Sequence, residues 1–400
     1  MLLLAALHQQ QGDATSAKEA LRSLVEADAK AENLPARLRL FSLLAAQDDA
    51  KASSEATKVM EQTAQLYAQR CPHDIVGLAT LRVLAGTSDT DEIQNLETLN
   101  DGSALSHVAE MCLLHLALDD ASHLAHKCLI HERLAEIGAS EIAPPTRICE
   151  SDAALAAALE NTPEGSLWYI KDPAVQRGQG IRIVRGPVDP ANVKQWVPAG
   201  RRVCLQEAVK PALLDNAKFG VRMHVLVTTA PEDEALRVFV SRDGILTKCG
   251  KSYAHDDTTP LGQITCTSVQ RGEAGFNREA VKGPASELWD GFQEALPLID
   301  HAALRSIEAV AGKLCAKPSL KMTRAQLFGY DFCFDDTGKP VFIEANISPQ
   351  FQDAKKLASL RKSLAPLLIN TLPRLLRKDA PETFREPCLG WRFVGQVESS

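Results

Sequence analysis

The segment Phe328-Gly-Tyr-Asp331-Phe-Cys-Phe-Asp335-Asp-Thr-Gly-Lys-Pro340-Val-Phe-Ile-Glu344-Ala-Asn346 is the most informative stretch of this chain. Two runs of alternating apolar residues flank Asp336–Lys339, and this pattern predicts a β-hairpin with a four-residue loop. If the hairpin is symmetric about its loop, Asp331 lies directly opposite Glu344, with Cβ atoms roughly 5 Å apart. Asn346 follows Glu344 by two residues and therefore shares its face.

The facing carboxylates predict a metal site. Like charges directly opposite each other destabilise a sheet, and a divalent cation between them reverses that effect. Oxygen atoms of Asp, Glu and Asn suit a hard ion such as Mg²⁺, so we predict Asp331, Glu344 and Asn346 as metal ligands. A solvated acidic face is the alternative, because only the opposite face is solidly apolar; that face comprises Tyr330, Phe332, Phe334, Val341 and Ile343.

The composition is that of a soluble globular protein. The chain has 400 residues, of which 45% are hydrophobic and 24% charged, and this length suggests two or three domains. Its net charge of −7 argues against general nucleic-acid binding. The ten cysteines are scattered without a CxxC pair, which favours reduced thiols and a cytoplasmic location. No run approaches 18 apolar residues, and Met1–Leu7 lacks the basic residues of a signal peptide, so we expect no membrane association.

Residues 1–129 are predicted to be entirely helical, since they are rich in Ala and Leu with apolar positions three to four residues apart. Leu3–Leu21 resembles a tetratricopeptide helix–turn–helix, with Gly12 at the turn and Ala17 where the two helices approach. The period decays afterwards, so we predict a degenerate TPR-like region. It is either a module that binds a protein partner or a plain structural bundle.

Residues 130–380 are predicted to form an α+β domain. Ile142–Thr146 contains two prolines that end the helical part, and β-type patterns with interspersed helices follow. Residues 381–400 are predicted to be an irregular tail. The expected strands, besides the hairpin, are Trp168–Lys171, Ile181–Val184, Arg202–Glu207, Phe219–Thr228, Ala235–Ser241 and Ile245–Cys249, and the expected helices are Asp152–Glu160, Ser286–Leu298, Ala302–Cys315 and Ala354–Arg377.

A glycine-rich loop lies between the first two of these strands. Lys171 ends one strand, and Arg177-Gly178-Gln-Gly180 leads into the next. Backbone N–H groups of such a loop can bind a polyphosphate, and a simple hairpin turn is the alternative. The loop is neither a Walker loop nor a Rossmann fingerprint, because no helix follows it and GxxxxGK[ST] is absent.

The strand Phe219–Thr228 and the residue before it carry bases on one face. Period two places Lys218, Gly220, Arg222 and His224 together, opposite an apolar face. Neighbouring bases repel unless an anion lies over them, although a solvated edge strand is the alternative. Arg242, in the turn after the next strand, could join them. With the glycine-rich loop and the carboxylate pair, these bases predict a Mg–ATP site, because phosphoryl transfer depends on positioning and charge neutralisation.

The order and spacing of five motifs resemble the tubulin–tyrosine-ligase-like amino-acid ligases, a branch of the ATP-grasp fold. The resemblance covers about residues 130–375. Its motifs lie within Trp168–Ile181, Leu205–Val227, Val238–Gly244, Gln263–Gln270 and Phe328–Pro349.

This resemblance implies an ATP- and Mg²⁺-dependent ligase that forms an amide through an acyl-phosphate. An amino acid would be joined to a protein carboxylate, with an acidic tail such as that of tubulin as a candidate acceptor. The implied nucleotide ligands are Lys171, Arg177, Gly178, Gly180, Gln206, Ala208, Val209 and Lys218, with adenine near Gln206, Ala208 and Val209. Arg222 and Arg242 would act on the transferred phosphate and acyl group.

The chain also departs from the family pattern. Gly220 replaces an Asp, Cys266 an Asn, Gln263 a His and Ala208 an aromatic residue, and Asp172 is inserted after Lys171. Two further functions are therefore open: a ligase with a small-molecule or peptide acceptor, and a nucleotide-binding pseudoenzyme that serves as a scaffold. Ala354–Lys378 holds seven bases and no acid, and it would either bind an acidic tail or form a solvated helix face.

Overall fold

The computed structural model of the chain describes residues 13–86, 118–314, 324–347 and 390–398, together with Ala5, Pro349 and Leu367. Within these ranges it leaves out 29–32, 46, 48, 72–74, 119, 176–177, 195, 199–200, 230–234, 272–276 and 278–280. Arg177, the predicted helix Ala354–Arg377 and the basic segment Ala354–Lys378 lie outside the described residues, apart from Leu367. No helix in the described residues is long and apolar enough to span a membrane.

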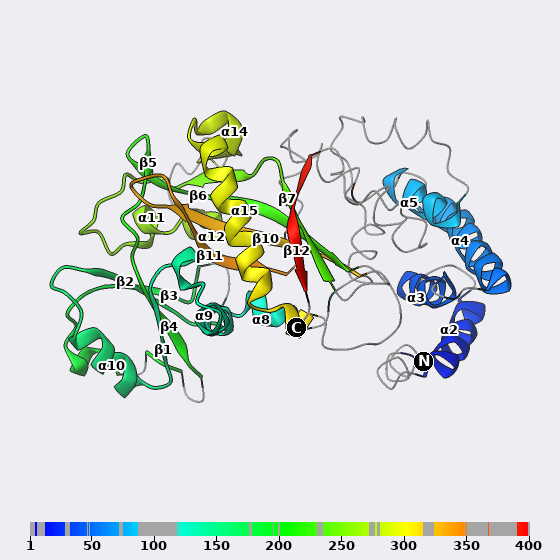
Figure 1. The fold of residues 1–400 in the computed structure, drawn as a ribbon, viewed down its shortest axis with the longest axis horizontal. Helices are drawn as coiled ribbons and strands as arrows, with labels where there is room; N and C mark the ends of the chain where they lie inside the picture. Colours follow the sequence, from blue (N-terminus) through cyan, green and yellow to red (C-terminus); the bar gives the residue numbers. More distant parts are fainter. Residues whose placement is uncertain are drawn as a thin grey trace.

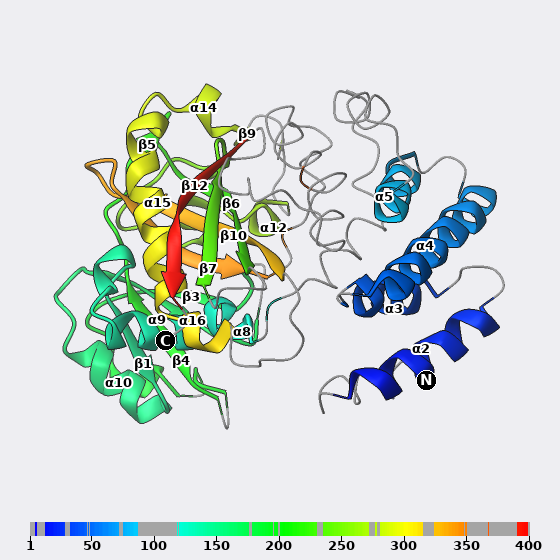
Figure 2. The same cartoon turned by 45° about the vertical axis from the view of Figure 1, so that its right-hand side comes forward.

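Helices form the described part of the N-terminal region, as predicted. They are α2 (Ala14–Ala27), α3 (Leu34–Ala45), α4 (Ala50–Arg70) and α5 (Ile75–Ala85). Asp13 and Asp49 cap α2 and α4, since each carboxylate accepts hydrogen bonds from backbone N–H groups of the first turn. The four helices follow one another in space in chain order (Figures 1 and 2). Their assignment as TPR-like repeats remains a prediction.

Two antiparallel sheets form the rest of the fold, which confirms the α+β prediction. The small sheet has the order β1-β4-β2-β3, and the large one has β11-β10-β6-β7-β12 as its main path. The small-sheet strands are β1 (Thr146–Cys149), β2 (Leu167–Lys171), β3 (Ile181–Arg185) and β4 (Val203–Glu207). The large sheet holds β5 (Leu213–Leu214), β6 (Ala217–Thr229), β7 (Ala235–Ser241), β8 (Ile245–Lys248), β9 (Lys282–Pro284), β10 (Ala325–Phe334), β11 (Pro340–Asn346) and β12 (Trp391–Glu398).

Helices cover the outer faces of both sheets (Figure 1). Three helices, α14, α15 and α16, replace the predicted pair Ser286–Leu298 and Ala302–Cys315, and α15 is continuous across the predicted gap at 299–301. The helices are α8 (Ser122–Ala125), α9 (Lys127–Glu136), α10 (Asp152–Glu160), α11 (Pro260–Gln263), α12 (Thr267–Gln270), α14 (Ala285–Leu288), α15 (Phe292–Glu308) and α16 (Ala311–Leu314), with 3₁₀ turns at Ser140–Ile142 and Pro190–Asn192.

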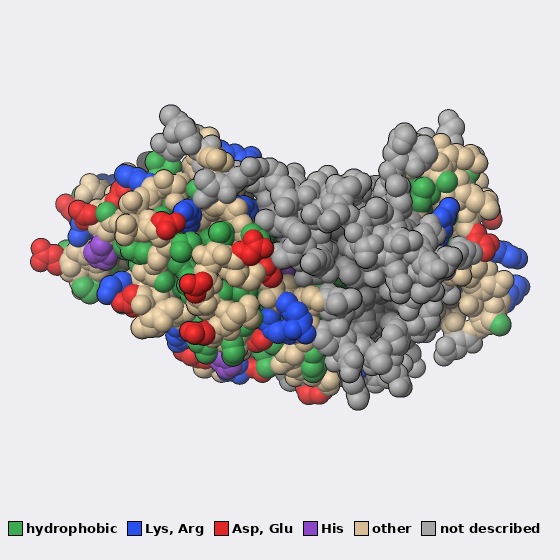
Figure 3. All heavy atoms as spheres, turned by 90° about the horizontal axis from the view of Figure 1, so that it is seen from above, with side chains coloured by type: hydrophobic (Ala, Val, Ile, Leu, Met, Phe, Trp, Pro, Cys, Tyr) green, Lys and Arg blue, Asp and Glu red, His purple; other side chains and the backbone are tan. Residues whose placement is uncertain are grey.

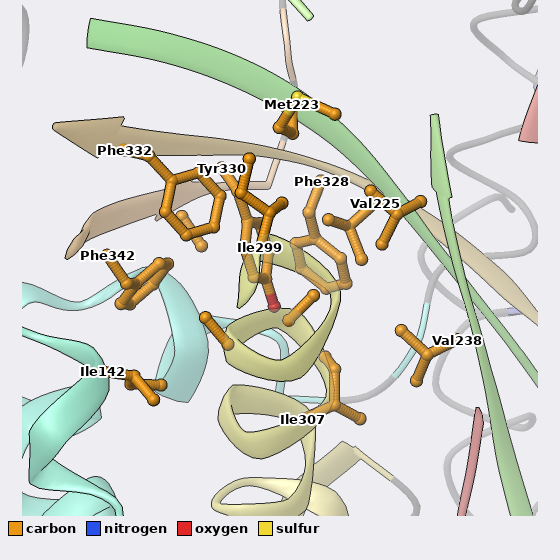
Figure 4. Close-up of a cluster of buried hydrophobic side chains, with 14 of the residues drawn as sticks. Ile142, Met223, Val225, Val238, Ile299, Ile307, Phe328, Tyr330, Phe332 and Phe342 are labelled. Carbon is orange, nitrogen blue, oxygen red and sulfur yellow. The ribbon is translucent and has the colours of Figure 1, made fainter. Parts of the chain in front are cut away.

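The main core lies between α15 and the large sheet. Figure 4 shows the aromatic side chains of β10 directed toward Ile299 and Ile307 of α15. The hydroxyl of Tyr330, fully buried in this core, pairs with Ser306 Oγ of α15 at 2.8 Å, so its polar atom is satisfied. This helix therefore covers the face of the sheet opposite the predicted metal ligands.

The predicted irregular tail is wrong for Trp391–Glu398, which forms β12. This strand pairs antiparallel with β7 at the edge of the large sheet. Its side-chain alternation is interrupted by a register shift between Phe393 and Gly395, so the period-two pattern is short. Trp391 is almost completely buried and anchors the strand.

A β-bulge in the β10–β11 hairpin sets the register at the predicted site. Asp331 pairs with Glu344, as predicted, but Phe332 pairs with Phe342. Ile343 is thus the extra residue on β11. As a result Phe342, and not Ile343, joins the core face: its ring lies 5.2 Å from that of Tyr330 and 6.0 Å from that of Phe332. Ile343 is only partly buried, and Val341 pairs with Cys333 instead of Phe334, so both residues leave the core face on which they were predicted.

Candidate active site

The hairpin brings the three predicted metal ligands together on one face. Asp331 and Glu344 are cross-strand partners. The Asn346 amide donates to Asp331 Oδ2 at 3.3 Å, so the two residues are in contact. In the part of the chain that the structure describes, no three His, Cys, Asp or Glu residues are grouped as metal ligands. Any metal here would be held by two carboxylates and one amide.

Two cations face these carboxylates. Arg222 of β6 binds Asp331 through two parallel hydrogen bonds of 2.7 and 2.6 Å, and Asp331 is the main reason that the pKa of Arg222 is raised. Lys127, the first residue of α9, has its Nζ 3.7 Å from Glu344 Oε2. Lys127 was not among the predicted site residues. It comes from a helix far from the hairpin in sequence, and no spacing motif marks it.

Lys171 is buried at the centre of a polar network between α9 and the small sheet. Its ammonium donates to Gln206 Oε1, while Gln206 Nε2 donates to Thr146 Oγ1 at 3.0 Å and lies 3.2 Å from His131 Nε2. Burial lowers the pKa of Lys171, and the nearby carboxylate of Glu344 opposes that shift. The structure thus brings Lys171 and Gln206 together, and Lys171 lies near Glu344, one of the predicted metal ligands. His131 is a further residue that sequence reasoning missed.

We expect His131 to make stability fall in mild acid. Burial, together with the charge of Lys171, lowers the pKa of His131 to about 4, whereas an unfolded histidine titrates near 6.5. Because only the unfolded chain gains this proton between pH 6.5 and 4, the free energy of unfolding should fall by about 2 kcal/mol from pH 7 to pH 5. Urea unfolding at both pH values measures it. His131→Gln should lose most of this drop, and His301→Gln, at an exposed position of α15, should retain it.

Lys218 connects the two sheets. Its Nζ donates to the hydroxyl of Tyr169 on β2 at 3.0 Å, and that hydroxyl donates to Gln263 Oε1 at 3.1 Å. The Gln263 amide nitrogen in turn donates to the carbonyl groups of Ala254 and Asp257, both at 2.8 Å. Gln263 therefore holds a loop in place, and Lys218 lies on the inner side of the small sheet with Lys171.

The glycine-rich loop is tightly packed. Gly178 has φ +76°, and a Cβ there would lie 2.7 Å from Val269 Cγ2; a Cβ on Gly180 would lie 2.5 Å from Val175 Cβ. Only glycine fits either position without movement of its neighbours. The loop backbone is thus held close to α12. Lys127 Nζ also donates to the Val175 carbonyl at 3.3 Å.

The remaining predicted residues lie at the margins. Ala208 and Val209 follow β4, and the Ala208 N–H donates to the Leu167 carbonyl at 2.9 Å. Arg242 is exposed in the turn between β7 and β8. Within the described residues no hydrogen bond joins its side chain to Asp331 or Glu344. The nucleotide and phosphate roles of these three residues remain predictions.

Gly220 lets two strands approach closely. A Cβ at this position would lie 2.8 Å from the carbonyl oxygen of Phe332 and 3.3 Å from Thr265 Oγ1. The Asp expected from the family pattern therefore cannot occupy this backbone without a shift of β10.

We expect Gly220→Ala to destabilise the fold by about 1–3 kcal/mol, because the added methyl group meets backbone and not a flexible side chain. Urea unfolding of the variant measures the change. A change below about 0.5 kcal/mol would show that β10 moves aside at little cost.

A cavity of about 310 Å³ lies beside the glycine-rich loop, on the face of the small sheet that carries Ile170. Ile170, Arg182 and Val203 line it, and the Arg182 guanidinium carbon lies 4.5 Å from the centre of the Trp196 ring. Strand alternation turns Ile170 away from Lys171. Gln179 and Gly180 of the glycine-rich loop also line this cavity, so it adjoins the predicted nucleotide ligands on the side of the small sheet that faces away from Lys171.

The residues present fit Mg²⁺ with bound phosphates. Magnesium in phosphoryl-transfer enzymes is held by one or two carboxylates while water and substrate phosphates complete its shell. Asp331 and Glu344 supply two carboxylates, Asn346 supplies a carbonyl oxygen, and Lys127, Lys171 and Arg222 are cations within their reach. The site can therefore balance the charge of a metal-bound polyphosphate.

Comparison with known proteins supports the same family. The profile described as "Tubulin-tyrosine ligase family" matches residues 117–375. The chain is 25% identical over 217 residues to mouse Tubulin polyglutamylase TTLL6, covering 49% of this chain and 25% of that protein. It is 22% identical over 226 residues to Tubulin glycylase 3B of Drosophila melanogaster, covering 53% and 29%. For human Tubulin monoglutamylase TTLL4 the identity is 26% over 240 residues, covering 54% and 19%.

The chain thus spans less than a third of the length of each of these three relatives. The matched segment nevertheless covers more than half of this chain and includes α8, α9 and all predicted site residues. By sequence and by the α+β fold that carries the site, the chain belongs to the tubulin-tyrosine ligase family, which is of the ATP-grasp type.

Proposed function

We propose that the chain is an ATP- and Mg²⁺-dependent ligase that joins an amino acid to a carboxylate of an acidic protein tail. The observation that carries the proposal is the facing pair Asp331 and Glu344, with Asn346 beside them and Arg222 bound to Asp331. The names of the similar proteins, polyglutamylases and a glycylase of tubulin, support tubulin as the candidate acceptor. We place the ligase domain at residues 130–380 and the helical region at 1–129.

The reaction assigned to the site has two steps. A carboxylate oxygen of the acceptor attacks the terminal phosphorus of ATP, which forms an acyl-phosphate and releases ADP. The amine of the amino acid then attacks the acyl carbon, forming an amide and releasing phosphate. A Mg²⁺ ion at Asp331, Glu344 and Asn346 would neutralise phosphate charge, and Lys127, Lys171 and Arg222 would stabilise the charge that develops on the transferred group.

The proposal also includes a binding site for the acidic tail of the acceptor. On the face seen in Figure 3, acidic and basic side chains are interspersed over the described part of the surface. A mixed surface of this kind does not select an acidic tail. We therefore assign tail binding to the basic segment Ala354–Lys378, which lies outside the described residues.

One assay tests the proposal. The protein is incubated with Mg–ATP, the standard amino acids and either tubulin or an acidic peptide, while ADP release and the mass of the acceptor are followed. ADP release that requires an amino acid, with a matching gain in acceptor mass, supports protein ligation. Amino-acid-dependent ADP release without a change in acceptor mass favours a small-molecule acceptor. Binding of ATP without turnover would overturn the proposal in favour of a scaffold, which the replacements at Gly220 and Cys266 would explain.

A further inference from the structure

Two cysteines lie within reach of a covalent bond where α9 packs on the small sheet. Cys128 Sγ of α9 is 3.1 Å from Cys204 Sγ of β4, although the residues are 76 positions apart in sequence. Both are free and almost completely buried, at 0% and 1% exposure. A disulfide bond is about 2.05 Å long, so the two sulfurs must approach by only about 1 Å.

A disulfide between these two cysteines would act on helix α9, which contacts both sheets. Along the same two elements, Arg202 binds Glu132 through hydrogen bonds of 2.6 and 3.1 Å, and Gln206 contacts His131 at 3.2 Å. Cys204 is the cross-strand partner of Lys171. Immediately before Cys128, Lys127 reaches across to Glu344 on the large sheet. Helix α9 thus connects both sheets, and the cysteine pair lies at its contact with the small one.

We propose that Cys128 and Cys204 form a reversible disulfide that locks α9 to β4 under oxidising conditions. With a peroxide as oxidant, the Cys128 sulfur attacks one peroxide oxygen, the O–O bond breaks, and a sulfenic acid forms as water leaves. The Cys204 sulfur then attacks the Cys128 sulfur; the S–S bond forms, the S–O bond breaks, and a second water leaves with the Cys204 proton. Two thiols and one peroxide thus give one disulfide and two waters.

The two sulfurs share a hydrogen bond in which either can be the donor. This contact lowers the pKa of Cys128 and raises that of Cys204. The same bond forms whichever of the two sulfurs is oxidised first. Cys149 of β1 provides a matched control, because it is also free and buried and lies on the strand next to β4.

The test maps disulfides in the full chain after treatment with hydrogen peroxide. We expect a peptide that links Cys128 to Cys204 and disappears on reduction with dithiothreitol. Cys149→Ser should keep this link, and Cys128→Ser or Cys204→Ser should lose it. A Cys128–Cys149 link would overturn the proposal. Unlinked Cys128 and Cys204 at a peroxide concentration that oxidises the partly exposed Cys71 and Cys266 would also overturn it.

Stability gives a second readout. The oxidised chain should unfold at a higher urea concentration than the reduced chain, because the bond restricts the unfolded state, and Cys204→Ala should abolish the difference. If the proposed function holds, oxidation should also weaken Mg–ATP binding several-fold by drawing Lys127 away from Glu344. Unchanged binding in a chain with the mapped link would overturn this coupling. A chain without the link would overturn the disulfide itself, so the two failures are distinguishable.

Discussion

Glu344→Gln should lower amino-acid-dependent ADP release by about 10³-fold while the protein stays folded. Glutamine keeps the length of the side chain and one carbonyl oxygen, but it removes the charge that would face Mg²⁺. The side chain is 31% exposed and its contact with Lys127 is 3.7 Å, so the lost ion pair should cost at most about 1 kcal/mol of stability. Steady-state ADP release and urea unfolding of the variant measure the two effects separately.

Asp336→Asn is the matched control. It makes the same change from acid to amide in the same hairpin, at a loop residue whose carboxylate contacts exposed Lys210 at 2.7 Å. We expect it to keep near-normal ADP release. Full activity of the Glu344→Gln variant would show that Glu344 does not bind the metal. Loss of activity in both variants would indicate damage to the hairpin instead.

The sequence was sufficient for those parts of the site that follow from strand alternation. Asp331 and Glu344 share a face because they are cross-strand partners, and Asn346 joins them two residues further along β11. The bases of β6 face away from its apolar core side by the same strand alternation. The residues on α9 could not be predicted in this way. Lys127 and His131 reach the site through packing between distant segments, and nothing in local spacing encodes that contact.

Irregularities in the strands account for most other differences. The bulge at Ile343 adds one residue that strict alternation does not contain, and the shift at Gly395 in β12 shortens its pattern. A symmetric hairpin placed Asp331 opposite Glu344, and the bulge preserves that pairing while it changes the residues closer to the loop. The predicted neighbourhood of Asp331, Glu344 and Asn346 is therefore present, and their role as metal ligands stays a prediction. Val341 and Ile343 do not lie on the predicted core face.

Phe342→Ala should lower the free energy of unfolding by about 3–5 kcal/mol, as expected for a large aromatic side chain removed from a core. Phe342 is completely buried, and its ring packs on those of Tyr330 and Phe332. The loss would leave a cavity beneath β10, next to α15. Urea unfolding with fluorescence detection measures the change.

Ile343→Ala is the comparison that separates the bulge from a regular hairpin. Because Ile343 is only partly buried, its truncation should cost about 1 kcal/mol. In a hairpin without the bulge, Ile343 would face the core and Phe342 would share the face of Glu344, so the order of the two effects would be reversed. A larger loss for Ile343→Ala than for Phe342→Ala would therefore contradict the observed register. It would also move an aromatic ring to the face on which we place the metal ligands.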